Sequence, residues 1–227
     1  MKSLLIKKNI LEDNDKVAGE IRERLKEKKV FAINLLGSPG AGKTTVLEKV
    51  IENLKNKYKM AVIEGDLYTS KDGERIEKHN IDVIQVNTGG GCHLDATMIN
   101  RALENIKCDD LEFLVIENVG NLVCPASYDL SEDMKVVVMS VTEGNDKPLK
   151  YPSMFQRASL VILNKVDIIN FTDFNKEEFY RDLNLLNKDL KVLEVSCREN
   201  IGLKELSNYF EEQIEKKKLY RWLENIF

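Results

Sequence analysis

The stretch VFAINLLGSPGAGKTT, residues 30–45, joins an apolar run to a glycine-rich loop and then to a segment with helical spacing. The loop GSPGAGKT, residues 37–44, fits the pattern G-x-x-x-x-G-K-[ST], which cradles phosphates when it lies between a strand and a helix. The apolar run is uninterrupted, which predicts a strand buried on both faces, as in a parallel sheet. This stretch therefore predicts a strand, a phosphate-binding loop and a helix in succession.

The loop residues have separate expected roles. Gly37, Gly40 and Gly42 allow backbone turns that side chains would obstruct, so that loop N–H groups and the helix N-terminus face the phosphates. Lys43 is expected to reach the β- and γ-phosphate oxygens, which makes it a catalytic candidate, and the Thr44 hydroxyl is expected to coordinate Mg²⁺. The predicted nucleotide-binding segment is Gly37, Ser38, Pro39, Gly40, Ala41, Gly42, Lys43, Thr44 and Thr45.

Apolar runs of strand length alternate with amphipathic stretches along the rest of the chain, which predicts a doubly wound α/β fold with a mostly parallel, seven-stranded sheet. We expect one P-loop NTPase domain over residues 1–227, with an N-terminal helical extension at 1–29 and a C-terminal tail at 218–227. The apolar end of the tail, including Trp222, is expected to dock on the same domain. The predicted strands are 30–36, 60–65, 81–86, 111–117, 134–141, 160–164 and 191–196, and the predicted helices are 14–29, 43–57, 94–107, 174–188 and 202–217.

Composition limits the class of protein. The 227 residues suffice for one large domain with a core, and the formal net charge of -4 argues against nucleic acid as a partner. No apolar run approaches the roughly 20 residues that cross a bilayer. The first residues are too charged for a signal peptide, so we expect a cytoplasmic protein without a membrane partner. Four scattered cysteines do not form a disulfide framework.

The tetrapeptide NKVD, residues 164–167, follows the sixth predicted strand and selects the base. Asp167 can accept hydrogen bonds from guanine N1–H and N2–H₂, and adenine has neither donor. A site built around such bonds rejects the analogue lacking them by roughly 10⁴–10⁵-fold. Asn164 is expected to orient the loop and contact the base, and the Lys165 stem to cover its face. The sequence therefore predicts GTP, with Ser196 and Cys197 of SCREN backing the base.

Acidic residues near strand ends predict the magnesium and water positions. Small GTPases carry D-x-x-G after the fourth strand, and this chain has Glu117 and Gly120 there, with the Gly120 N–H expected to meet the γ-phosphate. Asn121 replaces the glutamine that positions water in Ras-like proteins, which predicts slow unaided hydrolysis, with Asp66 orienting the water. Asp72 has the alternative interpretation of a solvated loop charge. The predicted magnesium ligands are Thr44, Asp66, Asp72 and Glu117.

The stretch TGGGCHLDA, residues 88–96, places Cys92 and His93 after the third strand, and Cys124 follows the fourth. Loops after parallel strands gather at one sheet edge, so these soft ligands are expected close together. Three ligands are one short of tetrahedral zinc, and adjacent residues are not expected to chelate one ion readily. A two-fold dimer would supply four thiolates and two imidazoles for one or two ions, Zn²⁺ or Ni²⁺. Nucleotide state could then bias the dimer.

The remaining soft ligands have structural interpretations. Cys108 is expected to end a helix, and His79 to be a solvated side chain. Cys197 is not expected to be reactive. For Cys92 and His93 themselves, a small buried thiol and a surface histidine are the alternative to a metal site.

Taken together, GSPGAGKTT, EGDLYTSKD, TGGGCHLDA, ENVGNLVCPA and NKVD resemble the hydrogenase nickel-incorporation GTPases, the HypB family of metallochaperones among P-loop GTPases. The resemblance covers nearly the whole chain. The phosphate loop and NKVD indicate only a GTPase, whereas TGGGCHLDA together with VCPA is the part of the resemblance that is specific to this family. The Cys-Pro-His triplet of the urease nickel chaperone and the Cys-x-Cys-Cys motif of the cobalamin-linked branch are both absent from the sequence.

The resemblance implies GTP-dependent dimerisation and delivery of nickel to a [NiFe]-hydrogenase large-subunit precursor, assisted by a small nickel- and zinc-binding partner chaperone. It carries the metal ligands over to Cys92, His93 and Cys124. The segment MKSLLIKKNI lacks the cysteine-rich motif or histidine-rich tract of some members, so nickel storage is not expected. Two alternatives stay open: a GTP-switched regulator whose metal is a structural staple of the dimer, and, disfavoured by NKVD, a small-molecule P-loop kinase.

Overall fold

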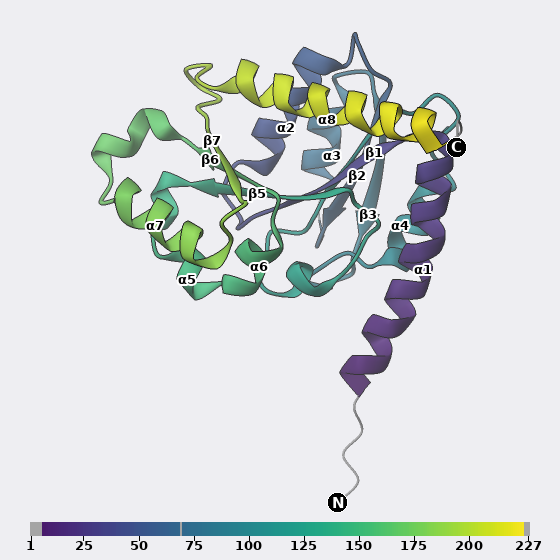
Figure 1. The fold of residues 1–227 in the computed structure, drawn as a ribbon, viewed down its shortest axis with the longest axis horizontal. Helices are drawn as coiled ribbons and strands as arrows, with labels where there is room; N and C mark the ends of the chain where they lie inside the picture. The colour runs from purple at the N-terminus through teal and green to yellow at the C-terminus, as the bar shows by residue number, and fades with distance from the viewer. Residues whose placement is uncertain (1–5, 69, 225–227) are drawn as a thin grey trace, which may run out of the picture.

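The computed structural model of the chain describes residues 6–68 and 70–224, with side chains placed for residues 10–68 and 70–219. In this part of the chain seven strands form one sheet in the order β3-β2-β4-β1-β5-β6-β7 (Figure 1). All neighbouring strands are parallel, which confirms the doubly wound α/β prediction. The strands are β1 (Phe31–Leu36), β2 (Met60–Asp66), β3 (Asp82–Asn87), β4 (Phe113–Glu117), β5 (Met134–Ser140), β6 (Leu160–Asn164) and β7 (Lys191–Glu194).

Helices cover both faces of the sheet. In Figure 1, α2, α3 and α8 lie on one face, and α1, α4, α5, α6 and α7 on the other. The strands alternate accordingly: Ile33 packs with the α2 and α8 residues, and Ala32 with those of α1 and α4. The helices are α1 (Ile6–Lys28), α2 (Lys43–Leu54), α3 (Lys71–Glu77), α4 (Ala96–Leu103), α5 (Lys147–Lys150), α6 (Pro152–Arg157), α7 (Lys176–Leu186) and α8 (Leu203–Glu224), with short 3₁₀ segments η1 (Cys124–Ser127), η2 (Val141–Glu143) and η3 (Val166–Phe171).

The observed elements differ from the sequence predictions mainly in the helices. The short helices α3, α5 and α6 were not predicted, because one or two turns leave too little sequence for a periodic pattern. Helix α1 begins at Ile6 rather than at residue 14, and α4 ends at Leu103. Cys108 therefore lies beyond the helix that it was expected to end, where its side chain is 6% exposed. Trp222 lies outside the residues whose side chains are described.

Helix α1 is joined to the sheet by its second half. Ala18, Ile21 and Leu25 are 0%, 1% and 2% exposed against β1, β2 and β4 residues. The buried side chain of Asn14 accepts from the Ala96 N–H at 2.8 Å and donates to the Asp129 carbonyl at 2.9 Å. Helix α1 therefore holds the N-terminus of α4, which directly follows the Cys-His loop. The division of residues 1–227 into one domain with an N-terminal extension at 1–29 and a C-terminal tail at 218–227 stays a prediction.

Strand order decides which loops meet at the carboxyl edge of the sheet. β4 lies between β1 and β2, and Glu117 pairs in register with Leu35 on one side and with Glu64 on the other. The phosphate loop, which follows β1, therefore lies beside the loop that follows β4. Among the described residues, no helix combines the length and the apolar character required to cross a membrane.

Candidate nucleotide and metal sites

The loop between β1 and α2 has the backbone shape that the glycine pattern predicts. Gly42 has a φ of 95°, in the left-handed region that favours glycine. A Cβ atom built on Gly42 would lie 2.4 Å from Nδ2 of Asn164, so a side chain does not fit here. Helix α2 begins immediately afterwards at Lys43, so the positive end of its dipole lies at this loop. This arrangement is suited to an anion.

A cavity of about 500 Å³ opens between this loop and the ends of β2 and β4. We call it the phosphate cavity. The Lys43 ammonium lies within it, 3.4 Å from the Gly37 carbonyl and 3.5 Å from the Ser38 carbonyl. Burial lowers the pKa of Lys43, and the charge of Glu117 opposes that effect. Of the predicted nucleotide and magnesium residues, the phosphate cavity is lined by Pro39, Gly40, Gly42, Lys43, Thr44, Thr45, Asp66, Asp72, Glu117, Gly120 and Lys165.

Two glutamates lie side by side in the floor of the phosphate cavity. Glu64 and Glu117 are each 3% exposed, and the Thr44 hydroxyl donates to Oε1 of Glu117 at 2.7 Å. The Oε2 atoms of both glutamates are buried and have no hydrogen-bond partner among the described residues. Burial raises the pKa of Glu64 to about 8 and that of Glu117 to about 7, and the charge of Glu117 adds to the shift of Glu64.

This oxygen-rich set fits a magnesium ion. Mg²⁺ prefers carboxylate and hydroxyl oxygens together with phosphate, and both glutamates, each with one unpartnered carboxylate oxygen, line the phosphate cavity together with Thr44. Sequence reasoning included Thr44 and Glu117 but missed Glu64. A signal was present, because Glu64 is a charged residue that interrupts the apolar strand MAVIEG.

The two predicted aspartates have different surroundings. Asp66 ends β2, and its backbone carbonyl accepts from the Thr88 N–H at 3.0 Å. Asp72 lies in the first turn of α3, where its side chain is 42% exposed and accepts from Arg75 at 3.1 Å. Arg75 also donates to the Thr45 hydroxyl at 3.1 Å and to Glu48 at 2.6 Å. Asp72 is therefore ion-paired rather than simply solvated, and Arg75 is a cavity residue that the sequence analysis did not include.

Two of the predicted base-reading residues, Asn164 and Lys165, contact the phosphate loop. Asn164 donates to the Ala41 carbonyl at 3.0 Å, and the Lys165 ammonium donates to the Gly40 carbonyl at 2.8 Å. Cys197 Sγ lies 3.8 Å from Asn164 Oδ1, and burial raises the pKa of this thiol to about 11, with a smaller contribution from Asp167. A thiol of that pKa is not a nucleophile at neutral pH. Ser196 accepts from the Glu199 N–H at 3.1 Å and so closes its turn.

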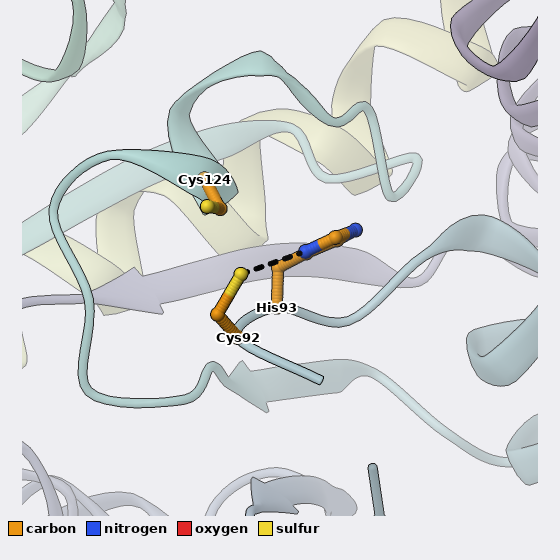
Figure 2. A group of neighbouring side chains, drawn as sticks. All are labelled: Cys92, His93 and Cys124. Atoms are coloured by element: carbon orange, nitrogen blue, oxygen red, sulfur yellow. Dashed lines mark hydrogen bonds between the residues drawn. The ribbon is translucent and has the colours of Figure 1, made fainter. Parts of the chain in front are cut away.

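Cys92, His93 and Cys124 meet within one chain. Their potential ligand atoms all lie within 4.8 Å of one another, and Cys92 Sγ is 3.6 Å from His93 Nδ1 (Figure 2). We call these three residues the soft-ligand cluster. The adjacent residues 92 and 93 were expected to be poor joint chelators. They converge because they lie in a bend, whereas neighbours in an extended strand point to opposite faces.

The local environment sets the protonation of the soft-ligand cluster. The contact with Cys124, assisted by burial, raises the pKa of the Cys92 thiol. Burial lowers the pKa of His93, whose ring centroid lies 3.9 Å from that of Tyr128. A neutral imidazole offers a lone pair to a metal at neutral pH. Cys92 is exposed to solvent while Cys124 is half-buried, so the cluster is open on one side.

The other soft residues lie apart from this cluster. His79 is not a solvated side chain as expected, because it is 16% exposed and its Nε2 lies 3.9 Å from Glu48 Oε1. Cys108 is buried against backbone carbonyls. Asn118, which follows Glu117, is 1% exposed and accepts from the Leu94 N–H at 3.2 Å. One buried amide, missed by sequence reasoning, therefore ties the end of β4 to the Cys-His loop.

Comparisons with known proteins agree with this arrangement. Residues 31–194 match the family described as the CobW/HypB/UreG nucleotide-binding domain. Over 208 residues, 92% of this chain and 68% of the relative, the sequence is 49% identical to the hydrogenase maturation factor HypB of Azotobacter chroococcum mcd 1. A crystal structure of HypB from Helicobacter pylori in complex with nickel matches with a TM-score of 0.86 and 38% identity, over 90% of this chain and 96% of that one. The hydrogenase maturation factor HypB from Archaeoglobus fulgidus matches with a TM-score of 0.84 and 36% identity, over 90% and 100% of the two chains.

Proposed function

The chain belongs to the HypB hydrogenase maturation factors of the CobW/HypB/UreG family, and from that premise we propose a specific activity for it. It is a GTP-binding, slowly GTP-hydrolysing metallochaperone that dimerises in response to nucleotide and metal. It helps to insert nickel into a [NiFe]-hydrogenase large-subunit precursor, assisted by a small nickel- and zinc-binding partner chaperone. The cytoplasmic location and the lack of nucleic-acid and membrane partners remain predictions from the sequence.

The observation that carries this proposal is the position of the soft-ligand cluster beside the phosphate cavity. Cys124 and the cavity residue Glu117 belong to neighbouring parts of one segment, and Cys92 contacts that segment through Asn121. Three soft ligands with an exposed member leave a coordination position open, whereas structural zinc sites are closed by four ligands. An open site beside a nucleotide suits an ion that must be released. The nickel complex of the Helicobacter pylori relative supports nickel as the cargo, and zinc is the alternative occupant.

The phosphate cavity supplies the groups for GTP binding and hydrolysis. The Lys43 ammonium would hold the β- and γ-phosphate oxygens, and the Gly120 N–H would donate to the γ-phosphate. Asp167, in η3 shortly after the end of β6, would accept from guanine, and Ser196 and Cys197 would back the base. Thr44, Asp66, Asp72 and Glu117 would hold Mg²⁺, which when bound neutralises charge that develops on the phosphates.

We expect slow hydrolysis because both polar groups of the Asn121 side chain are already hydrogen-bonded. Its amide donates to the Cys92 carbonyl at 3.1 Å and its oxygen accepts from the Val123 N–H at 2.8 Å. A side chain engaged in both ways does not hold an attacking water as a Ras-like glutamine does. Asp66, which lines the phosphate cavity from the end of β2, is the residue that would orient the water.

Dimerisation would complete the metal site. Two chains joined at the soft-ligand cluster would bring together four thiolates and two imidazoles, enough for one or two ions. Exposed apolar side chains next to this cluster support such a contact, because Val123 is 62% exposed and Tyr68 is 74% exposed. Apolar residues in that position would be covered in the dimer.

Metal transfer in defined nucleotide states tests the proposal. The nickel-loaded full chain is mixed with a colorimetric nickel acceptor in the presence of Mg²⁺ with GTP, a non-hydrolysable GTP analogue or GDP, and oligomeric state is measured by light scattering. We expect the transfer rate and the dimer fraction to depend on the nucleotide, and Cys92→Ala and Cys124→Ala to abolish loading. Cys108→Ala is the matched control. Transfer that is indifferent to nucleotide and to both thiols would contradict delivery, and metal that stays bound in every state would favour the structural staple.

A further inference from the structure

Asn121 lies directly on the phosphate loop. Its backbone forms an isolated antiparallel bridge with that of Gly37. The preceding residue, Gly120, packs so closely on Pro39 that a Cβ atom there would lie 2.9 Å from Pro39 Cγ and 3.1 Å from Pro39 N. Gly120 and Asn121 therefore both contact the phosphate loop.

The side chain of Asn121 reaches in the opposite direction, to the soft-ligand cluster. Its Nδ2 donates to the Cys92 carbonyl at 3.1 Å, and its Oδ1 accepts from the Val123 N–H at 2.8 Å. The first bond holds the backbone that carries Cys92, and the second holds the backbone that leads to Cys124. Figure 2 shows the two thiols on separate segments that face each other. One side chain is thus hydrogen-bonded to both segments.

We propose that Asn121 is the positioning residue that transmits nucleotide state to the metal site, through the hydrogen bond from its amide to the Cys92 carbonyl. The inference rests on the proposed function and deepens it by naming the connection between the two sites. Asn118 does not take this role, because its amide is buried and joined to Leu94 and Asn34 rather than to a cysteine backbone. Movement of Gly120 displaces Asn121, and the amide carries the displacement to Cys92, so the spacing of the two sulfur atoms changes.

Two substitutions separate the donor from the rest of the side chain. Asn121→Asp keeps the size of the side chain and the oxygen that accepts from Val123 N–H, but it replaces the donor amide by an oxygen that faces the Cys92 carbonyl. Asn121→Ala removes both hydrogen bonds and adds no charge. An effect common to the two variants therefore reports the lost donor and not the new charge of the aspartate. Ser127→Ala, at the end of η1 on the same segment, is the control for a change in local packing.

The measurement is the ratio of Ni²⁺ dissociation constants with GDP and with a non-hydrolysable GTP analogue, using the full chain with Mg²⁺. Coupling between two sites changes affinity by about 5–150-fold and is reciprocal, so Ni²⁺ must change the ratio of the affinities for the analogue and for GDP by the same factor. In the wild type we expect a ratio within this range. In both Asn121 variants we expect both factors to fall to within about twofold of one, while GDP affinity and nucleotide-free Ni²⁺ affinity change by less than about threefold.

The outcomes separate this inference from the function on which it rests. A wild-type ratio of one overturns both. A wild-type ratio above one that persists in the Asn121 variants overturns the role of Asn121 and leaves the metallochaperone proposal intact. Equal losses of Ni²⁺ affinity in both nucleotide states would show a merely structural role and also overturn the inference. Far-ultraviolet circular dichroism of each variant establishes that it is folded, and Asn121→Asp serves if Asn121→Ala does not fold.

Discussion

In the phosphate cavity the ionisable side chains of Glu64 and Glu117 are each 3% exposed, whereas at the soft-ligand cluster Cys92 is open to solvent. Both regions lie at the same edge of the sheet. The phosphate cavity is lined by residues of α2, β2, α3 and β4 and of the loops that follow β1, β2, β4 and β6, all within one chain. The soft-ligand cluster has three members from two loops. The difference suits a resident nucleotide in one region and a transferable ion in the other.

The two regions also respond differently to protons. In the phosphate cavity burial raises the pKa values of two carboxyl groups, so the folded chain without cations retains protons that an unfolded chain would lose. In the soft-ligand cluster a thiol must lose its proton before it can bind a metal. One region is therefore stabilised by the arrival of a cation, and the other must be deprotonated to receive one.

The largest expected effect is a loss of nucleotide affinity with little change in metal affinity. Lys43→Ala deletes a buried ammonium that would make two or three charge-assisted hydrogen bonds to phosphate, so we expect the dissociation constants of GDP and GTP to rise by roughly 10²–10⁴-fold. Nucleotide-free Ni²⁺ affinity should change little. Isothermal titration calorimetry measures both, and Lys49→Ala, a half-buried lysine on the same helix that pairs with Glu52, is the control. A parallel loss of Ni²⁺ affinity would show that metal binding depends on the phosphate cavity.

The reciprocal substitution lowers metal affinity and leaves nucleotide affinity nearly unchanged. Cys92→Ala deletes a thiolate ligand, and we expect Ni²⁺ affinity to fall by at least about 100-fold, because even partners of ligands contribute about 10–100-fold. GDP affinity should stay within about twofold of the wild-type value. Competition with a metal indicator measures the first quantity. Cys108→Ala removes a buried thiol and should leave Ni²⁺ affinity unchanged, and a loss in that variant would point to a different site.

The pH dependence of metal binding sharpens the contrast between the regions. The pKa of the Cys92 thiol is raised, so this thiol is protonated at neutral pH and releases a proton when a metal binds. We expect Ni²⁺ affinity to rise with pH, with Cys92 contributing about tenfold per pH unit below its pKa. The pKa of His93 is lowered, so His93 adds no slope above neutral pH. Titrations between about pH 6.5 and 8.5 measure the slope, which should be shallower in Cys92→Ala. A flat wild-type profile would contradict thiolate ligation.

The smallest expected effect concerns the stability of the phosphate cavity without ligands. The pKa of Glu64 is about 8 in the fold against an ordinary 4.5, so the folded state holds more protons and stability is lost as pH rises through this interval. Glu64→Gln removes this loss. We expect the variant to be more stable than wild type by about 1–3 kcal/mol above the raised pKa, with the difference vanishing towards acid pH.

Chemical unfolding across this pH range, without nucleotide or Mg²⁺, measures the free energies for Glu64→Gln. Glu52→Gln, an exposed carboxylate on α2, should change stability by no more than about 0.5 kcal/mol. Addition of GDP and Mg²⁺ should favour the wild type, because Glu64 then faces a cation. A Glu64→Gln variant that is less stable than wild type at alkaline pH would show that other groups in the fold already balance the negative charge of Glu64 and Glu117.

Several features followed from the sequence because they depend on local patterns. Uninterrupted apolar runs predicted the strands, and the spacing in GSPGAGKT predicted the glycine loop between β1 and α2, while base reading by NKVD stays a prediction. Each pattern occupies consecutive residues, and its conformation is decided by neighbours along the chain. The same locality explains why α3 and α5 were missed, because a helix of one or two turns carries no periodic signal.

The remaining features were decided by the tertiary structure. Glu64 is a cavity residue because β2 pairs with β4 and sets it beside Glu117. The bend at residues 92 and 93 turns two adjacent side chains towards Cys124, and Asn121 reaches both the phosphate loop and the Cys92 carbonyl. These contacts join residues far apart in sequence. Their geometry depends on strand order and register, which the free energy of packing the whole sheet determines and which no single stretch of sequence encodes.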